Sequence, residues 1–318
     1  MLFSNAYFGD KVRLYASLPS AFFRHAATLL EYLRETEEAS PQWMSVLLVY
    51  LGMVDKADVE LRDGSKFCLT KETLHRFIGA VQSYNTDISK YKGMKIKLDD
   101  GFATFKIRGM DIRAEKSSLS AVLGEFTSDF HNVEDVEGRV VLDVGAYMGE
   151  TAMLYAMMGR ARHVYAFEPV RYLYLNMVKN IKLNNLQSRI TPINAMLVGH
   201  EPKRMERVRS NPFGPSKNVK MISLNEFVKR IDIRNGMLKL DCEGGEYEII
   251  KNSPSSTLNR FKIIHVEYHY GYRDIFERFK AEGMAVSYTK PGVMAIGMSS
   301  GIRYGGDIVA RNRKASLD

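Results

Sequence analysis

The sequence has few cysteines and no long apolar run. Its 318 residues contain two cysteines, Cys68 and Cys242, which excludes a disulfide framework and a multi-cysteine metal site. The longest apolar stretch, residues 43–54, is shorter than the roughly 20 residues that a membrane-spanning helix needs. The N-terminus lacks the basic-then-apolar pattern of a signal peptide. These absences predict a cytoplasmic protein without a membrane span.

The composition is that of an ordinary globular protein, with 45% hydrophobic and 26% charged residues. The charge is unevenly distributed along the chain. Residues 1–135 hold 17 Lys+Arg and 19 Asp+Glu, a net charge of −2, whereas residues 136–318 hold 28 and 18, a net charge of +10. A positive excess suits an anionic substrate or a nucleic acid, although solubility alone would also explain it.

The first 115 residues predict a helical and α+β accessory region. Residues 1–55 have helical patterning, and residues 71–84 predict a further helix. Two segments, 58–70 and 94–107, alternate apolar and polar residues around an Asp-Gly pair, which predicts a β-hairpin in each. No motif with a chemical function stands out in this region.

From residue 138 onward, strand and helix patterns alternate, which predicts an α/β fold with a mostly parallel sheet covered by helices on both faces. The expected strands are residues 139–144, 163–168, 189–194, 236–241, 261–267, 283–288 and 306–311. The expected helices are residues 149–158, 170–184, 223–231, 246–252 and 273–281. In such a sheet, ligands bind beyond the carboxyl ends of the strands.

The first of these strands ends in an acidic, glycine-containing loop. Residues 140–151 read Val-Val-Leu-Asp-Val-Gly-Ala-Tyr-Met-Gly-Glu-Thr. Gly145 and Gly149 allow a sharp turn and a close approach to a ligand, but their spacing is not the Gly-x-Gly-x-x-Gly of dinucleotide-binding proteins. Asp143 disfavours a pyrophosphate and favours a positively charged cofactor. The loop therefore predicts a site for S-adenosylmethionine, which carries a sulfonium.

The next two strands end in residues suited to an adenosine. Glu168, followed by Pro169, stands 23 residues after Gly145, where a carboxylate can accept both ribose hydroxyls. The third strand ends in Asn194 and Ala195, which we expect beside the adenine. A plain turn at these two residues is an equally good interpretation.

Pairs of ionisable residues follow the fourth and fifth strands. Asp241 and Glu243 are two residues apart, as are Glu267 and His269, so each pair shares one face of extended chain. We expect the four side chains to converge near the reacting methyl group. His269 is the first candidate for a general base because an unperturbed histidine titrates near neutral pH, and Asp241 or Glu267 would orient it or the substrate. We expect no metal ion, although these side chains also suit Mg²⁺ or Mn²⁺.

Several blocks of this sequence resemble the FkbM-type methyltransferases, which are class I S-adenosylmethionine-dependent enzymes. The blocks keep their order and spacing over residues 120–290. They are Asp143-Val144-Gly145-Ala146 with Gly149, Phe167-Glu168-Pro169, Ser223-Leu224-Asn225-Glu226-Phe227, Lys239-Leu240-Asp241-Cys242-Glu243-Gly244, and Glu267-x-His269. The resemblance implies a Rossmann-like methyltransferase domain over residues 116–318, with a seven-stranded sheet whose last strand is antiparallel.

The resemblance also implies O-methylation of a hydroxyl on a small molecule, sugar or lipid-linked acceptor. By position, Asp143, Gly145 and Gly149 would border the methionine half of the cofactor. Glu168 would bind the ribose, and Asp241 would lie next to the reactive methyl group. The loop residues after Gly145 depart from the family in one respect: Ala146 fits, but Tyr147 stands where the family usually has Asn. Cys242 stands where an apolar residue is usual.

Two other functions stay open. The positive charge of residues 136–318 favours an RNA methyltransferase, against which stands the absence of a recognisable RNA-binding module. A non-catalytic adenosyl-binding protein is the third interpretation.

Residues 203–220, with six basic residues and one acid, predict a loop that attracts an anionic substrate or is simply solvated. The helical N-terminus could dock on the catalytic domain or form a homodimer.

Overall fold

The computed structural model describes residues 33–62, 64–70, 73–85, 95–99, 102–127, 133–202, 206–209, 216–297 and 301–313. The chain divides into two compact units. The first contains Met1–Phe105, Ala114–Gly124 and Ala295–Ile302, and the second contains Lys106–Arg113, Glu125–Met294 and Arg303–Asp318. No helix in the described part of the chain has both the length and the apolar character needed to span a bilayer.

The first unit contains the predicted hairpin and helix. Strands β1 (Lys56–Glu60) and β2 (Lys66–Thr70) pair in antiparallel fashion, and α4 (Leu74–Asn85) follows them. Residues 33–39 and α3 (Trp43–Leu51) are helical, as expected, whereas the helices expected before residue 33 lie outside the described residues. Phe77 of α4 and Leu69 of β2 are fully buried in the small core of this unit.

A three-stranded sheet with the order β3-β4-β5 follows. Strands β3 (Lys97–Asp99) and β4 (Phe102–Ile107) form the second predicted hairpin, and β5 (Met110–Glu115) is an addition that the sequence pattern did not predict. The connection to the main sheet contains three short elements. They are η2 (Lys116–Ser118), α5 (Leu119–Thr127) and η3 (Val133–Val136).

The main sheet of the second unit has the predicted topology. Its strands are β6 (Val140–Val144), β7 (His163–Phe167), β8 (Ile190–Ile193), β13 (Gly236–Leu240), β14 (Phe261–Tyr268), β15 (Ala285–Tyr288) and β17 (Gly301–Arg311). Their order is β15-β17-β14-β13-β6-β7-β8, and β17 runs antiparallel to both of its neighbours. The expected α/β sheet of seven strands with an antiparallel last strand is therefore confirmed, and β16 (Gly292–Gly297) pairs with β17 in addition.

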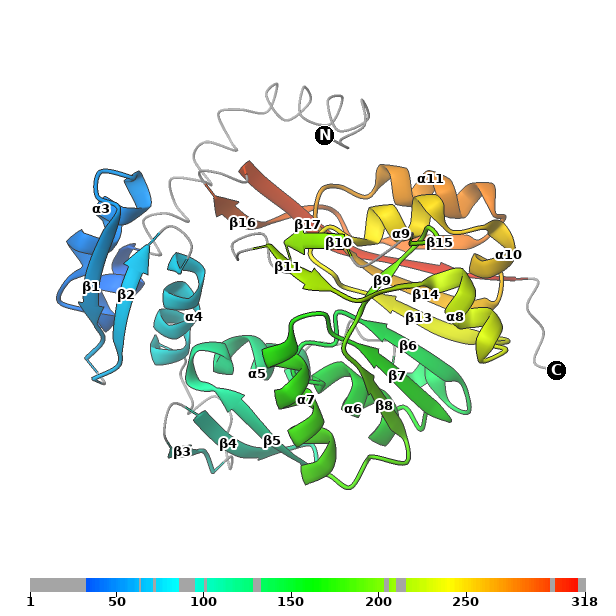
Figure 1. Cartoon of the computed structure of the whole chain (residues 1–318), viewed down its shortest axis with the longest axis horizontal. Helices are drawn as coiled ribbons and strands as arrows, with labels where there is room; N and C mark the ends of the chain where they lie inside the picture. Colours follow the sequence, from blue (N-terminus) through cyan, green and yellow to red (C-terminus); the bar gives the residue numbers. More distant parts are fainter. Residues whose placement is uncertain are drawn as a thin grey trace. The chain divides into compact units, whose positions relative to one another are not determined.

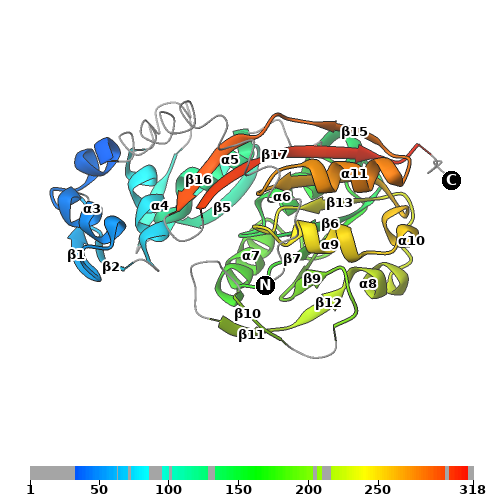
Figure 2. The ribbon, with the colours of Figure 1, turned by 90° about the horizontal axis from the view of Figure 1, so that it is seen from above.

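All five helices predicted for this part of the chain are present. They are α6 (Glu150–Met157), α7 (Arg171–Leu183), α8 (Leu224–Arg230), α9 (Glu246–Asn252) and α11 (Arg273–Ala281), with a short α10 (Ser255–Leu258) in addition. Figure 1 shows α6 and α7 on one side of the sheet and α8 to α11 on the other. Helices α9 and α11 lie side by side, as Figure 2 also shows.

Four short strands lie between β8 and α8. Strands β9 (Met196–Val198) and β12 (Met221–Ser223) are parallel neighbours, and β10 (Glu206–Arg209) forms an antiparallel hairpin with β11 (Ser216–Val219). The basic segment 203–220 was expected to be a loop, and this hairpin corrects that expectation. Residues 203–205 and 210–215 of the segment lie outside the described part of the chain.

The two faces of the central strands differ in polarity. Leu142, Leu238 and Ile264 pack into an apolar core with α8, α9 and α11. Because successive side chains of a strand alternate between faces, the residues that follow them in the chain point toward α6. Those residues are Asp143, Lys239 and His265, which are neighbours across three adjacent strands and are all buried. The sheet thus carries a row of buried polar side chains on the face that meets α6.

Two asparagines of α7 cover the open edge of β5. The Asn184 side chain accepts a hydrogen bond from the backbone N–H of Asp111 and donates one to its carbonyl, at 2.8 and 2.7 Å. Asn180 makes the same pair with Arg113, at 2.9 and 3.1 Å, and also donates to the Met148 carbonyl at 3.0 Å. Side-chain amides therefore replace the neighbouring strand that this edge lacks. Asn180 in addition fixes the loop between β6 and α6.

We expect Asn180→Ala to lower the free energy of unfolding by about 2–4 kcal/mol, because it removes the partners of a buried Met148 carbonyl and of two partly buried backbone groups of Arg113. Asn184→Ala is the matched control. Its loss should be smaller, about 1 kcal/mol, since Asn184 is partly exposed and water can take its place. Urea denaturation followed by circular dichroism measures both, and equal losses would contradict the bridging role of Asn180.

Candidate active site

The loop between β6 and α6 turns at two glycines with left-handed backbone. Gly145 has φ +81° and Gly149 has φ +94°. A Cβ on Gly145 would lie 1.7 Å from the backbone oxygen of Asp241, where the end of β13 crosses the loop. The N–H groups of Gly145 and Ala146 both donate to the Phe167 carbonyl, at 3.0 Å. The close approach predicted for Gly145 is therefore an approach between the ends of adjacent strands.

Asp143 lies inside the protein with no exposed surface. Its Oδ2 accepts a hydrogen bond from the Thr151 hydroxyl of α6 at 2.7 Å, and its Oδ1 lies 3.5 Å from the Lys239 ammonium. Oδ1 has no hydrogen-bond partner. Asp143 thus links the end of β6 to the first turn of α6 and lies buried beneath the loop that joins them.

Glu168 follows β7 and holds the same loop from the side. Its Oε2 accepts from the Tyr147 N–H at 3.1 Å and its Oε1 accepts from the Val170 N–H at 2.7 Å. Tyr147 itself has left-handed backbone, with φ +48°. Burial raises the pKa of Glu168 to about 8, although the two N–H groups act in the opposite direction. The carboxyl group is therefore fixed in orientation by the backbone.

The third strand end supports Glu168 from behind. Asn194 donates hydrogen bonds to the carbonyls of Glu168 and Pro169, at 2.8 and 3.1 Å, and Ala195 is fully buried. These contacts bring the predicted adenosine residues Glu168, Pro169, Asn194 and Ala195 together at neighbouring strand ends. The amide nitrogen of Asn194 is engaged with the backbone, so its role in the structure is to hold the β7–α7 turn.

Lys239 is buried in β13 between two acids. Its ammonium lies 3.5 Å from Asp143 Oδ1 and 3.3 Å from Asp241 Oδ2. Burial alone would lower the pKa of Lys239, but the two carboxylates outweigh it and hold the pKa well above its ordinary value. Burial alone would raise the pKa of Asp241, but Lys239 and His269 keep it below its ordinary value. Lys239 therefore stays charged and keeps Asp241 charged.

His269 is held by a buried acid that follows β13. Its Nδ1 lies 2.9 Å from Glu246 Oε1, which also accepts from the His269 backbone N–H at 3.2 Å. Both side chains are buried. Glu246 Oε2 accepts from the Gly244 N–H at 2.9 Å. Glu246 thereby fixes the imidazole ring so that its other nitrogen, Nε2, faces the neighbouring carboxylates.

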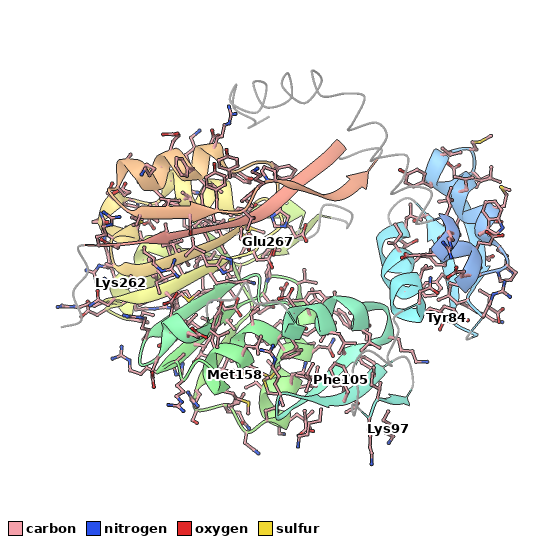
Figure 3. The ribbon with its side chains drawn as sticks, turned by 180° about the vertical axis from the view of Figure 1, so that it is seen from behind. Tyr84, Lys97, Phe105, Met158, Lys262 and Glu267 are labelled. Carbon is pink, nitrogen blue, oxygen red and sulfur yellow. The ribbon has the colours of Figure 1, made fainter. Side chains whose placement is uncertain are left out.

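The four predicted catalytic side chains do come together. His269 Nε2 lies 3.8 Å from Asp241 Oδ1 and 3.8 Å from Glu243 Oε2. Asp241, Glu267 and His269 each offer one ligand atom, and these atoms lie within 4.8 Å of one another. Figure 3 labels Glu267 near the carboxyl end of β14 and Lys262 near its opposite end. The convergence follows from β13 and β14 being parallel neighbours whose carboxyl ends meet at one edge.

The pKa values of Glu267 and His269 depend on the charged groups around them. Burial, and then the Asp241 carboxylate, raise the pKa of Glu267 to about 8. Burial alone would lower the pKa of His269, but Glu246, Glu243 and Asp241 outweigh it and raise the pKa to about 9. The imidazole thus carries a proton at neutral pH. It can act as the expected general base only in molecules that have lost this proton.

Three residues of this site have no predicted role in the sequence analysis. Lys239 begins one of the family motifs and Glu246 follows the same motif by two residues. Glu150 begins α6, where its Oε2 accepts a hydrogen bond from the Met148 N–H at 3.1 Å. The sequence does carry a signal for Lys239, since a charged residue inside the apolar run Met237–Leu240 must be paired when the strand is buried. Glu246 and Glu150 sit at helix starts, where acids are common for other reasons.

Comparisons with known proteins identify a domain over this site. Residues 143–283 match the family model described as the methyltransferase FkbM domain. No curated protein matches the chain.

Among solved structures, M. jannaschii TYW2 in complex with AdoMet is 13% identical, with 68% of this chain and 87% of that chain covered and a TM-score of 0.39. The M. jannaschii tRNA m1G37 methyltransferase is 13% identical, with 79% and 68% covered and a TM-score of 0.41. M. capricolum TrmK in complex with S-adenosyl-homocysteine is 14% identical, with 59% and 70% covered and a TM-score of 0.39. With identities and TM-scores this low, these likenesses carry no argument about reaction or substrate.

Gly145→Ala should destabilise the protein more than the same substitution at a glycine that has a similar positive φ but free space around it. Gly109, with φ +83° and no atom within 4 Å of an added Cβ, is the matched control. Gly109→Ala should cost about 1–2 kcal/mol from backbone strain. Gly145→Ala should cost about 1–3 kcal/mol beyond that, because the new methyl group collides with the Asp241 carbonyl. Chemical denaturation measures the free energy of unfolding of both variants. Similar losses in the two would show that the loop can move to make room for the methyl group.

Proposed function

We propose that the protein is an S-adenosylmethionine-dependent O-methyltransferase, because residues 143–283 match the family model described as the methyltransferase FkbM domain. Its acceptor would be a hydroxyl on a small molecule, a sugar or a lipid-linked molecule. One observation carries the proposal: ionisable side chains from four adjacent strand ends gather around the glycine loop of β6. Asp241, Glu267 and His269 form the centre of this group, with ligand atoms within 4.8 Å of one another.

The residues around the loop fit a cofactor with a ribose and a positive charge. Glu168 has both oxygens oriented by backbone N–H groups, and each oxygen keeps a lone pair for a ribose hydroxyl. Asp143 and Asp241 place negative charge beneath and beside the loop. The loop backbone would border the methionine half. The residues proposed to line the cofactor are Asp143, Gly145, Ala146, Tyr147, Gly149, Glu168, Pro169, Asn194, Ala195 and Asp241.

The acid–histidine group would handle the acceptor hydroxyl. When bound, S-adenosylmethionine supplies a methyl group activated by its sulfonium. The protein must orient the acceptor oxygen toward that group and take up the hydroxyl proton. Asp241, Glu267 and His269 lie so close together that the protonation of each depends on the others, and the proton passes to these three residues as a group. Glu243, beside this group, has 58% of its side chain accessible.

An RNA methyltransferase is the second candidate because residues 136–318 carry a net charge of +10. Binding to bulk RNA that weakens steeply as salt rises would favour it, since that dependence reports phosphate contacts. Binding of RNA that is negligible at physiological salt would leave the small-molecule, sugar or lipid-linked acceptor as the proposal.

Calorimetry tests the cofactor site directly. We expect S-adenosylmethionine and its demethylated product to bind the protein, and a nicotinamide dinucleotide not to bind. Glu168→Gln should weaken binding by about 10–100-fold, because the amide turns its NH₂ group toward a backbone N–H and leaves fewer acceptor lone pairs for the ribose hydroxyls. Glu277→Gln, an exposed acid on α11, is the matched control and should leave affinity unchanged. Binding of the dinucleotide alone would overturn the proposal.

His269→Ala should lower methyl transfer by about 10²–10⁴-fold while S-adenosylmethionine still binds, since the change removes a member of the proton-accepting group. His200→Ala is the control, because His200 is partly exposed and pairs with Glu248 at 2.6 Å, away from this group. Transfer of labelled methyl groups to pools of glycans, lipids and RNA gives the rate. Unchanged transfer in His269→Ala would remove this residue from the mechanism.

A further inference from the structure

Contrary to the expectation from the sequence, we propose that Asp241, Glu267 and His269 bind a divalent cation of the Mg²⁺ and Mn²⁺ class. Two carboxylates and one imidazole form an oxygen-rich ligand set of the kind that these ions accept. The binding of the cation stands on the geometry of the site alone. Its role in methyl transfer rests on the proposed function.

The first support is the position of the three ligand atoms. Asp241 follows β13 and Glu267 lies near the end of β14, and the two strands pair in parallel with Leu240 opposite Val266. Asp241 and Glu267 are therefore neighbours at one edge of the sheet, and His269 stands two residues further along. Their ligand atoms lie within 4.8 Å of one another. A small side-chain movement would bring all three onto one ion.

The second support is the orientation of the imidazole. Metal-binding histidines usually donate their other ring N–H to a carboxylate, which fixes the ring and the tautomer. Glu246 occupies that place on His269 Nδ1 at 2.9 Å and has no exposed surface. The His269 side chain is itself only 4% exposed, and Nε2 points into the acid group.

The third support is the distance from Nε2 to its neighbours. The 3.8 Å to Asp241 Oδ1 and to Glu243 Oε2 is too long for a hydrogen bond. Two ligand atoms that each lie about 2.1 Å from one ion are about 3.0 Å apart at a right angle and about 4.2 Å apart when opposite. The distance between His269 Nε2 and Asp241 Oδ1, two of the proposed ligand atoms, falls inside this range.

The fourth support is the way in which Lys239 divides the charges. Its ammonium approaches Asp241 through Oδ2, whereas the oxygen that faces His269 is Oδ1. Lys239 also pairs with Asp143, so one buried ammonium is shared by two acids. A divalent cation on the Oδ1 side would take the place of the protons that Glu267 and His269 hold in its absence. Bound there, it would polarise an acceptor hydroxyl and make its proton easier to remove.

Titration of Mn²⁺ into the full chain, stripped of metal by chelation, tests the site. Electron paramagnetic resonance of free Mn²⁺ should show one ion bound per chain. Glu267→Gln and His269→Gln should each weaken binding by roughly 10–100-fold, and Glu246→Gln should do so through the ring that it orients. Glu277→Gln and His200→Gln, at partly or fully exposed positions, are the matched controls and should bind Mn²⁺ as the unmodified chain does. Circular dichroism verifies that each variant is folded.

The absence of a bound ion in the unmodified chain would overturn the proposal. Mn²⁺ binding that is as tight in folded Glu267→Gln and His269→Gln as in the unmodified chain would also overturn it. Methyl transfer that survives exhaustive chelation would overturn the role of the ion in the reaction. Calorimetry with the demethylated cofactor product on the metal-free chain separates the two proposals. If the product binds and Mn²⁺ does not, the metal site is wrong and the proposed function stands; if Mn²⁺ binds and the product does not, the reverse holds.

Discussion

The buried ammonium of Lys239, shared by Asp143 and Asp241, is the interaction on which the geometry of this site depends. Two acids at the ends of adjacent strands would repel each other in a low-dielectric interior unless a cation stood between them. Lys239 supplies that cation from within the sheet. Because removing one member of a buried ion pair leaves an unpaired charge, the three residues are stable only together. The remaining acids of the site are arranged around this centre.

The backbone around the ion group is equally constrained. The β6–α6 loop passes so close to the end of β13 that a side chain at Gly145 has no room. Glu168 and Asn180 hold the same loop from two sides, through the Tyr147 N–H and the Met148 carbonyl. The loop is therefore shaped by strand ends and side-chain amides before any ligand binds. A site that is ordered in advance loses less entropy on binding.

Much of the fold could be predicted because hydrophobic periodicity reports local structure. The seven strands and five helices predicted after residue 138 follow the sequence pattern closely, and Gly145 and Gly149 stand at left-handed positions as their residue type suggests. Strand β5 was not predicted, although Met110, Ile112 and Ala114 alternate with polar residues and are buried in the structure. The hairpin of β10 and β11 escaped prediction because its charged residues carry no apolar alternation.

The sequence by itself determined the order of elements, the acidic strand ends and the residue types Asp241, Glu267 and His269 near the carboxyl edge of the sheet. Tertiary structure alone decided which atoms face one another. Glu246 contacts His269, which lies 23 residues further along the chain. This acid raises the pKa of a histidine that was expected to titrate near neutral pH, so that His269 holds its proton. This pKa shift depends on burial and on distances of a few ångströms between segments that are far apart in the chain. Neither can be read from the order of the residues.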